Sequence, residues 1–396
     1  MNDACDSAPS FRPNPLPITA FALTNALGRT TEEVLDALFA GRTGLMPCRL
    51  PLPFPTFAGE VAGELDAVLP KAFDSRAARI LARPLLELSS AIARAIERWG
   101  SRRVGLVLGT STGGIAETEA AFEAFSRTGE LPRDFDFERQ HAFHGLVEFA
   151  RQSTGIEGPA FALSTACSSS GKVFGSAQRL IASGLCDAVL VGGADSLCQT
   201  TLRGFGSLQV VSKRRCRPFC ADRDGLNIGE GAALLLLERD GECVSRLYGV
   251  GESADAHHMS HPHPEGLGAL AAMRGALSQA GLNPGEIDHI NAHGTGTRAN
   301  DLIEGRAIQK LFGSAVPVVS TKAYTGHLLG AGGATEAIFA CAAIARGRVP
   351  RALDTTPIDP ELDLFLPVQV LDTPPRAVLS NSFAFGGSNV SLILGR

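Results

Sequence analysis

No apolar run in this 396-residue sequence approaches the roughly 20 residues that a membrane-spanning helix needs. The stretch from Ala331 to Ala345 comes closest, but it is shorter and contains Glu336. The N-terminal segment Met1–Pro17 also lacks an apolar core, which argues against a secretory signal peptide and predicts a disordered leader. These absences predict a protein with no membrane span.

Positive charge and regularly spaced cysteines are also lacking. The chain has 36 Lys and Arg against 41 Asp and Glu, a net charge of −5, which argues against nucleic acid as a partner. The nine cysteines are an odd number and are scattered, unlike the framework of a disulfide-rich secreted domain. Reduced thiols in the cytoplasm are the simpler interpretation.

What is present is an alternation of short apolar runs with helical stretches, which predicts an α/β layered fold. The predicted strands are Val104–Leu108, Ala160–Leu163, Ala188–Val191, Ala233–Leu237, Ile287–Ile290, Val316–Ser320 and Val390–Leu394. The predicted helices are Arg76–Trp99, Gly171–Ala182, Leu267–Ala280, Asp301–Leu311 and Ala334–Ala345. The two parts of the chain echo each other, so we divide it into a leader (1–17) and two halves (18–243 and 244–396).

One cysteine lies where a nucleophile would be expected. Cys167 follows a predicted strand and precedes a predicted helix, within the small-residue segment Ser164–Ser170. Free N–H groups and the positive end of the helix dipole are expected there, and both lower a thiol pKa. The alternative, a buried structural cysteine, is common for free cysteines and stays open on this motif alone.

Two histidines share the same kind of setting. His293 and His327 each lie in a turn rich in glycine and threonine after an apolar run, and Lys322 precedes His327 by five residues. The carboxyl ends of strands in an α/β sheet line the usual ligand site, so we expect both histidines to converge on Cys167. A thiolate served by two imidazoles is suited to nucleophilic catalysis.

Three other signals compete for a function. The segment Gly109–Gly113 has the Gly-x-Ser-x-Gly pattern of a serine hydrolase elbow, with Ser111 as the alternative nucleophile. Basic residues in 213–217, and Arg76 with Arg79, form either solvated surface or a docking patch for an acidic partner. Four histidines within 257–263 suggest a metal site or, as we favour, a loop lining a pocket entrance.

Taken together, the motifs resemble the β-ketoacyl-acyl-carrier-protein synthases, the elongating, decarboxylating ketosynthases. The matching stretches are Thr165–Ser170, Arg217–Gly231, His293–Thr297, Lys322–Glu336 and Asn381–Asn389. The resemblance implies a thiolase-like, five-layered αβαβα fold with two pseudo-duplicated halves, and a cytoplasmic dimer. The motifs are similar to those of polyketide and aryl polyene ketosynthases as much as to those of fatty acid synthesis.

The resemblance also implies an activity and the residues that perform it. Malonyl and acyl groups, each on an acyl carrier protein (ACP), would undergo decarboxylative Claisen condensation to β-ketoacyl-ACP. Cys167 would carry the acyl chain as a thioester, and His293 and His327 would polarise the malonyl thioester carbonyl. Lys322 would hold His327 in place, with Glu304 as its partner.

Further residues are implied to bind the substrate. Thr295 and Thr297 would hydrogen-bond the phosphopantetheine arm, which arrives on the carrier protein. Phe383 and Phe385 would gate the acyl pocket, and the backbone N–H groups of Cys167 and Phe385 would form an oxyanion hole. No catalytic metal or organic cofactor is implied. The candidates for a structural monovalent cation site are Asn291, Glu336 and Ser382.

One departure and one alternative stay open. Ala384 stands where the family commonly has glycine, and its Cβ is expected to restrict the motion of the gate. The alternative is that the chain is itself a chain-length-factor-like subunit of a ketosynthase heterodimer. Such subunits keep the fold without the nucleophile, so a chain that retains Cys167 is expected to be the catalytic subunit. It would form a homodimer, or a heterodimer with such a partner.

Overall fold

The ten strands of the main sheet fall into two sets of five with the same topology. The structure is a computed structural model that describes residues 14–63, 65 and 68–396. The first set comprises β1 (Leu16–Asn25), β4 (Val104–Gly109), β5 (Ala160–Leu163), β6 (Ala188–Asp195) and β8 (Gly231–Glu238). The second comprises β9 (Ser245–Ala254), β10 (His289–Asn291), β11 (Val318–Val319), β12 (Ala377–Phe383) and β13 (Ser388–Gly395).

Across the sheet the order is β5-β4-β6-β8-β1 in one half and β11-β10-β12-β13-β9 in the other. Counted along the chain, both halves therefore read third, second, fourth, fifth, first. In each half the first three strands of that order are parallel to one another. The fourth strand runs antiparallel to both of its neighbours, the third and the fifth. The halves meet where Leu16–Ile18 of β1 pairs with residues 245–247 of β9. The predicted duplication is confirmed.

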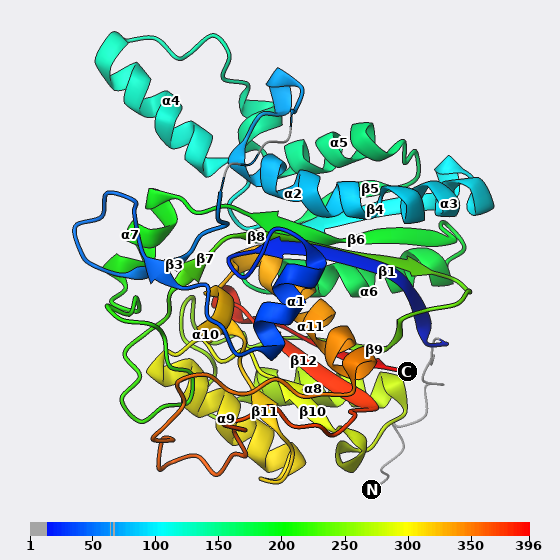
Figure 1. Ribbon diagram of the computed structural model, residues 1–396, viewed down its shortest axis with the longest axis vertical. Helices are drawn as coiled ribbons and strands as arrows, with labels where there is room; N and C mark the ends of the chain where they lie inside the picture. The colour runs from blue at the N-terminus through cyan, green and yellow to red at the C-terminus, as the bar shows by residue number, and fades with distance from the viewer. Residues whose placement is uncertain (1–13, 64, 66–67) are drawn as a thin grey trace, which may run out of the picture.

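Helices cover both faces of each half and fill the space between them (Figure 1). Between the halves lie α6 (Ser169–Ala182) and α11 (Gly332–Arg346), with α1 (Thr31–Phe39) beside them. The outer face of the first half carries α2 (Arg76–Glu87), α3 (Ser89–Trp99) and α5 (Phe143–Thr154). The outer face of the second carries α8 (Leu267–Ala280) and α9 (Arg298–Phe312). These are the five layers that the resemblance implied.

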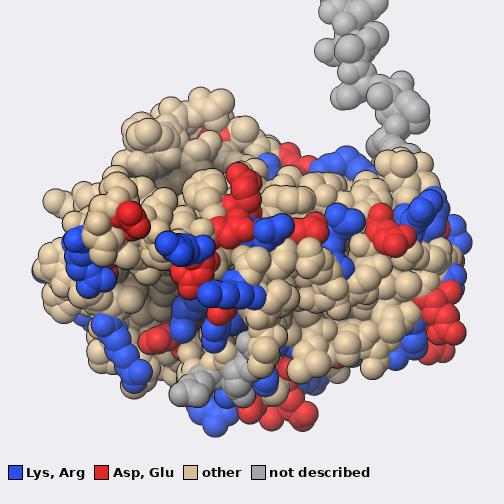
Figure 2. All heavy atoms as spheres, turned by 90° about the horizontal axis from the view of Figure 1, so that it is seen from above, with Lys and Arg blue, Asp and Glu red and all other residues tan. Residues whose placement is uncertain are grey.

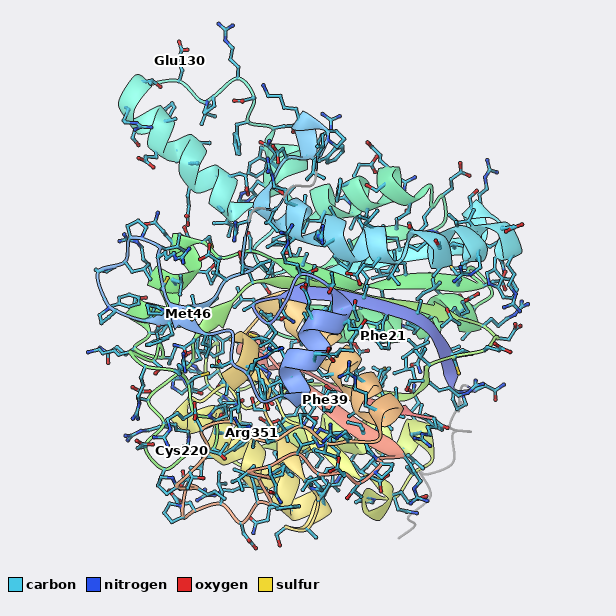
Figure 3. All side chains as sticks on the ribbon, viewed as in Figure 1. Phe21, Phe39, Met46, Glu130, Cys220 and Arg351 are labelled. Carbon is cyan, nitrogen blue, oxygen red and sulfur yellow. The ribbon has the colours of Figure 1, made fainter. Side chains whose placement is uncertain are left out.

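Shorter elements complete the chain. A three-stranded sheet contains β2 (Met46–Pro47), β3 (Phe57–Gly59) and β7 (Ile228–Gly229), and the remaining helices are α4 (Ile115–Thr128), α7 (Gln199–Ser207) and α10 (Lys322–Thr325). Figure 1 shows α4 projecting from the body as an arm, and Figure 3 shows Glu130, just past its end, near the tip. No helix in the described part of the chain combines the length and apolarity needed to cross a membrane.

The central helices are buried because their sequences are apolar or small on every side. In α11 every residue from Gly332 to Ile344 is buried, as expected for a helix packed between two sheets. The two central helices meet at glycines: a Cβ on Gly333 would lie 2.5 Å from the backbone nitrogen of Gly171. Glycine at these positions therefore allows α6 and α11 to lie in contact.

Two predictions about local structure need correction. The single helix predicted over Arg76–Trp99 is two helices, because α2 ends at Glu87 and α3 begins at Ser89, with Leu88 as the residue between them. The predicted leader ends too late, because β1 begins at Leu16; residues 1–13 of that leader lie outside the described residues. The division predicted at residue 243 falls in the connection between β8 and β9.

Candidate active site

Cys167 lies in a strained turn between β5 and α6. Strand β5 ends at Leu163 and the helix begins at Ser169, which leaves Cys167 buried at the carboxyl edge of the sheet. The preceding residue, Ala166, has a φ of 50°, a left-handed backbone conformation that residues other than glycine seldom adopt. Such strain persists only where the surroundings hold it, and it concentrates at functional positions.

The two predicted histidines converge on this thiol. Nε2 of His327 lies 2.9 Å from Sγ of Cys167, and the rings of His327 and His293 are 5.3 Å apart at an interplanar angle of 85°. All three side chains are buried, and one ligand atom from each falls within 4.8 Å of the others. They come from the turns after β5, β10 and α10, so residues far apart in sequence meet at one point.

The electrostatics of the thiol differ from the sequence expectation. Burial raises the pKa of Cys167 to about 11, and the charge of Lys322 and the backbone N–H of Phe385 offset only part of this effect. The prediction of a lowered pKa is therefore wrong for the free site, because removal from water outweighs the Lys322 charge and the backbone N–H groups near the thiol. The thiol is neutral and needs a base.

The histidines are suited to supply that base. Burial lowers the pKa of both His293 and His327 well below the usual range, and the nearby charge of Lys322 lowers it further. Both imidazoles are thus neutral, and each has one nitrogen that donates and one that accepts. Nε2 of His327 can accept the Cys167 proton across their 2.9 Å contact.

A third buried histidine allows a pH prediction away from the site. His289 contacts the carbonyl of Pro317 through Nδ1, and burial lowers its pKa to about 4. The unfolded chain binds this proton below pH ~6.5 while the folded chain does not, so acid favours unfolding. Urea unfolding between pH 7 and 4 should therefore show a smaller acid loss of stability in His289→Gln. Below pH ~6.5 its free energy of unfolding should fall by about 1.4 kcal/mol less per pH unit than that of wild type. Parallel curves for the two proteins would contradict this.

Lys322 has a different carboxylate partner from the one predicted. Its Nζ lies 2.6 Å from Oε1 of Glu336 on α11, and both side chains are buried. Glu304 instead accepts the backbone N–H groups of His293 and Gly294, each at 2.7 Å. The prediction of a Lys322–Glu304 pair is wrong because α9 directs Glu304 to the His293 turn. Burial raises the pKa of Glu304 to about 7.

No hydrogen bond or ion pair in the described residues joins the three predicted cation ligands Asn291, Glu336 and Ser382 to one another. Glu336 is bound to Lys322, and the amide of Asn291 lies 3.4 Å from the hydroxyl of Ser380, not that of Ser382. Within residues 14–63, 65 and 68–396, the one group of three or more His, Cys, Asp or Glu side chains with metal-ligand spacing is Cys167, His293 and His327 itself. The short contact in this cluster, between Cys167 Sγ and His327 Nε2, suits transfer of a proton from thiol to imidazole.

A cavity of about 390 Å³ opens onto the three residues. The hydroxyls of Thr295 and Thr297, 2.9 Å apart, line it. The predicted gate residues line it as well: Phe383 packs 6.2 Å from the His293 ring, and Phe385 lies 5.6 Å from the ring of Phe205 on α7. The structure thus places the two threonines and the two phenylalanines around the same space as the nucleophile.

The entrance is formed by loops that the sequence had singled out. His258 and His261 line the cavity with Pro262, as expected for a loop at the mouth. Ala384 has a φ of −108°, an extended conformation open to any residue, so its Cβ is accommodated in this state of the gate. Whether it restricts gate motion stays a prediction.

The predicted hydrolase elbow has another role. Ser111 donates its hydroxyl to the carbonyl of Ala166 at 2.9 Å, and the described structure pairs it with no histidine. The backbone and side chains of 110–112 surround the buried carboxylate of Asp195. Sequence reasoning missed Asp195, although a polar residue at the end of a buried strand, after Gly192-Gly193, was a usable signal.

The predicted docking arginines are largely neutralised. Arg214 and Arg217 pair with Asp222, Arg76 pairs with Glu230, and Arg79 pairs with Asp74. Figure 2 shows basic and acidic side chains interspersed on the face seen from above, not gathered in patches of one sign. The arrangement favours solvated and locally paired surface for these residues.

Comparison with known proteins places this site in context. The family models "Beta-ketoacyl synthase, N-terminal domain" and "Beta-ketoacyl synthase, C-terminal domain" match residues 14–242 and 244–356. The chain is 31% identical to the 3-oxoacyl-[acyl-carrier-protein] synthase 2 of Coxiella burnetii over 96% of this chain and 98% of that protein.

Two solved structures are similar over nearly their whole length. The ketosynthase ApeO of Xenorhabdus doucetiae, solved in complex with its chain length factor ApeC, is 40% identical with a TM-score of 0.89, covering 99% of this chain and 100% of that one. The ishigamide ketosynthase/chain length factor is 30% identical with a TM-score of 0.88, covering 97% and 99%.

Proposed function

The chain belongs to the β-ketoacyl synthase family, and on that premise we propose how its residues divide the reaction. The enzyme condenses malonyl-ACP with acyl-ACP, releasing carbon dioxide and forming β-ketoacyl-ACP. The observation that carries the assignment of residues is the 2.9 Å contact between Cys167 Sγ and His327 Nε2, beside His293 in a buried cavity.

The first half-reaction transfers the acyl chain to Cys167. His327 takes the thiol proton, and the thiolate attacks the thioester carbonyl of acyl-ACP. The N–H of Phe385, which already points at Sγ, and that of Cys167 stabilise the tetrahedral oxyanion. The phosphopantetheine thiol leaves with the proton from His327, which restores a neutral imidazole. The tautomer of the neutral ring that carries its proton on Nε2 is the donor that the next step needs.

The second half-reaction forms the carbon–carbon bond. The neutral rings of His293 and His327 donate hydrogen bonds to the thioester oxygen of malonyl-ACP, where negative charge develops as carbon dioxide leaves. The resulting enolate carbon attacks the thioester carbonyl on Cys167, and the thiolate leaves. It takes up a proton from water, which restores the neutral thiol. Burial, and after it the charge of Lys322, lowers the pKa of both histidines, so both rings are neutral donors in this step.

The cavity walls suit the shape of the donor. Thr295 and Thr297 present paired hydroxyls to the amides of a phosphopantetheine arm, which arrives on the carrier protein. Phe383 and Phe385 separate that arm from the acyl chain on Cys167. Similarity both to fatty acid synthases and to ketosynthases solved with chain length factors supports an elongating role in a fatty acid, polyene or polyketide pathway.

Replacement of either histidine tests this division. His293→Ala should leave transfer of a radiolabelled acyl group to Cys167 largely intact and slow malonyl decarboxylation about 10²-fold, since one donor to the enolate is lost. His327→Ala should slow decarboxylation similarly. His289→Gln, at a buried histidine outside the cavity, is the matched control and should condense normally. Normal condensation in both catalytic variants would refute their assigned roles.

A second subunit is expected on the side of the arm. Phe122 and Phe125 on α4 are 57% and 44% exposed, and Phe137 beyond it is 52% exposed. The strand β5 is an edge of the main sheet and is unpaired on one side in the described structure. Exposed aromatics and an open sheet edge are both features of interaction surfaces, and we infer that a second ketosynthase-fold subunit covers the arm.

The double variant Phe122→Asp/Phe125→Asp should shift the enzyme to monomer in sedimentation velocity, because two charges replace the apolar contact. Co-expression with a chain-length-factor-like subunit, compared with expression alone, separates heterodimer from homodimer. Leu185→Asp, an exposed apolar residue outside the arm, is the control. An unchanged assembly in the arm variant would contradict the inference.

The eight described cysteines are free thiols, which suits the cytoplasmic location we propose.

A further inference from the structure

Asp195 is a buried carboxylate that the proposed mechanism does not use. It ends β6, is 0% exposed, and forms no ion pair within the described residues. Its oxygens accept the hydroxyls of Thr110 and Thr112 at 2.6 and 2.8 Å and the N–H groups of residues 111 and 112 at 2.9 Å. A fifth donor, the N–H of Gly330, lies at 2.6 Å. An unpaired carboxylate is costly to bury, so donors this numerous are needed to hold it.

One set of these donors connects Asp195 to the turn that carries Cys167. The loop 110–112 that surrounds Asp195 also presents the hydroxyl of Ser111, which donates to the carbonyl of Ala166 at 2.9 Å. Ala166 is the residue with the left-handed backbone directly before Cys167. The carboxylate thus fixes the loop, and the loop fixes the strained turn that points the thiol into the cavity.

The remaining donor, the N–H of Gly330, connects Asp195 to the turn that carries His327. Gly330 follows His327 by three residues, and Leu329 between them has a φ of 52°, a second strained non-glycine residue. A Cβ on Gly330 would lie 2.7 Å from the Asp195 carboxylate, so only glycine lets the backbone come this close. The turn that carries His327 is therefore held by the same carboxylate as the turn that carries Cys167.

We propose that Asp195 is a positioning residue for the Cys167–His327 pair, with one carboxylate holding both turns so that thiol and imidazole stay in contact. The two turns belong to different halves of the fold, and within the described residues Asp195 is hydrogen-bonded to both sides. The proposal rests on the proposed function for the roles of the pair, and on geometry alone for the link between them.

The test compares Asp195→Asn with Asp187→Asn. Asp187 lies at the other end of β6, is nearly buried and is bound to Arg103 and Arg239, so its loss controls for general damage to the strand. In Asp195→Asn an amide NH₂ replaces one of the oxygens that accept from loop 110–112 and from Gly330, and acyl transfer to Cys167 should slow about 10²-fold. Asp187→Asn should transfer at the wild-type rate within about twofold.

A second readout separates positioning from loss of stability. Alkylation of Cys167 by iodoacetamide, followed against pH by mass spectrometry, reports the thiolate. The groups acting on that thiol are His327, Lys322, the Phe385 N–H and Asp195. Removing the Asp195 charge should move the alkylation midpoint to lower pH even as transfer slows. A merely destabilised protein would not shift this midpoint.

The variant Ser111→Ala keeps the proposal testable should Asp195→Asn fail to fold. It removes the hydrogen bond to Ala166 alone and should slow acyl transfer about tenfold, with the alkylation midpoint unchanged. Folded Asp195→Asn with wild-type transfer and an unmoved midpoint would overturn the proposal, as would Ser111→Ala with wild-type transfer. Failure of the proposed function would instead appear as acyl labelling that does not need Cys167.

Discussion

Replacement of Cys167 by alanine is expected to abolish acylation of the enzyme and to reduce condensation at least 10⁴-fold, because no other group can carry the acyl chain. The wild-type protein incubated with a radiolabelled acyl-ACP should hold the label through denaturation and release it to hydroxylamine, as a thioester does. The variant should hold none. Acyl transfer depends on the thiol and not on malonyl-ACP, so the result isolates the first half-reaction.

Cys186→Ala is the matched control for this experiment. Cys186 is also buried, and burial raises its pKa to about 11, the value reached by Cys167. The two thiols differ in their neighbours, since Cys167 alone has an imidazole nitrogen within hydrogen-bond distance among the described residues. Equal labelling of wild type and Cys186→Ala is expected. Label retained by Cys167→Ala would remove the nucleophile from the proposed mechanism, and activity lost only in Ser111→Ala would favour the hydrolase.

The second large effect is expected at the buried ion pair. Glu336→Gln leaves the Lys322 ammonium, 2% exposed, without a carboxylate, and breaking such a pair costs about 3–5 kcal/mol. Urea unfolding should show this loss directly. Lys322→Met strands the Glu336 charge and should be destabilised to a similar degree, while removing the positive field at the two histidines.

The double variant Lys322→Met/Glu336→Met separates stability from chemistry. Removing both charges leaves none unpaired, so the free energy of unfolding should return toward that of wild type. Decarboxylation should stay about 10²–10³-fold slow, because the charge near the developing enolate is still missing. A stable double variant with normal decarboxylation would show that Lys322 serves the fold alone.

Much of the fold could be predicted because its central strands are continuous apolar runs. Strands β6 and β8 are buried along their whole length, which is why the sequence marks them clearly. The arm helix α4 was missed because only Ala121 is buried along it, so no apolar stripe reveals it. Strand β9 was missed because two glycines interrupt its pattern. Neither α4 nor β9 therefore carries the apolar pattern by which a helix or strand is found in a sequence.

The site could be predicted as a set of residues but not as a set of contacts. Turns after strands identified Cys167, His293 and His327, because the carboxyl edge of a sheet gathers such turns. The partner of Lys322 could not be read from the sequence, since Glu304 and Glu336 lie on different helices and only their packing decides between them. The raised pKa of Cys167 likewise comes from burial, which is a property of the assembled site.

The shared strand order of the two halves has a consequence for ancestry. Cys167 follows β5, the third strand of its half, and precedes the central helix α6; His327 follows β11, the third strand of the other half, and precedes α11. Cys167 and His327 thus occupy corresponding positions in the two halves, as duplication of one ancestral unit would leave them. In the proposed mechanism one of these positions supplies the attacking thiol and the other supplies its base. The 2.9 Å contact between Cys167 and His327 therefore joins two turns of corresponding origin.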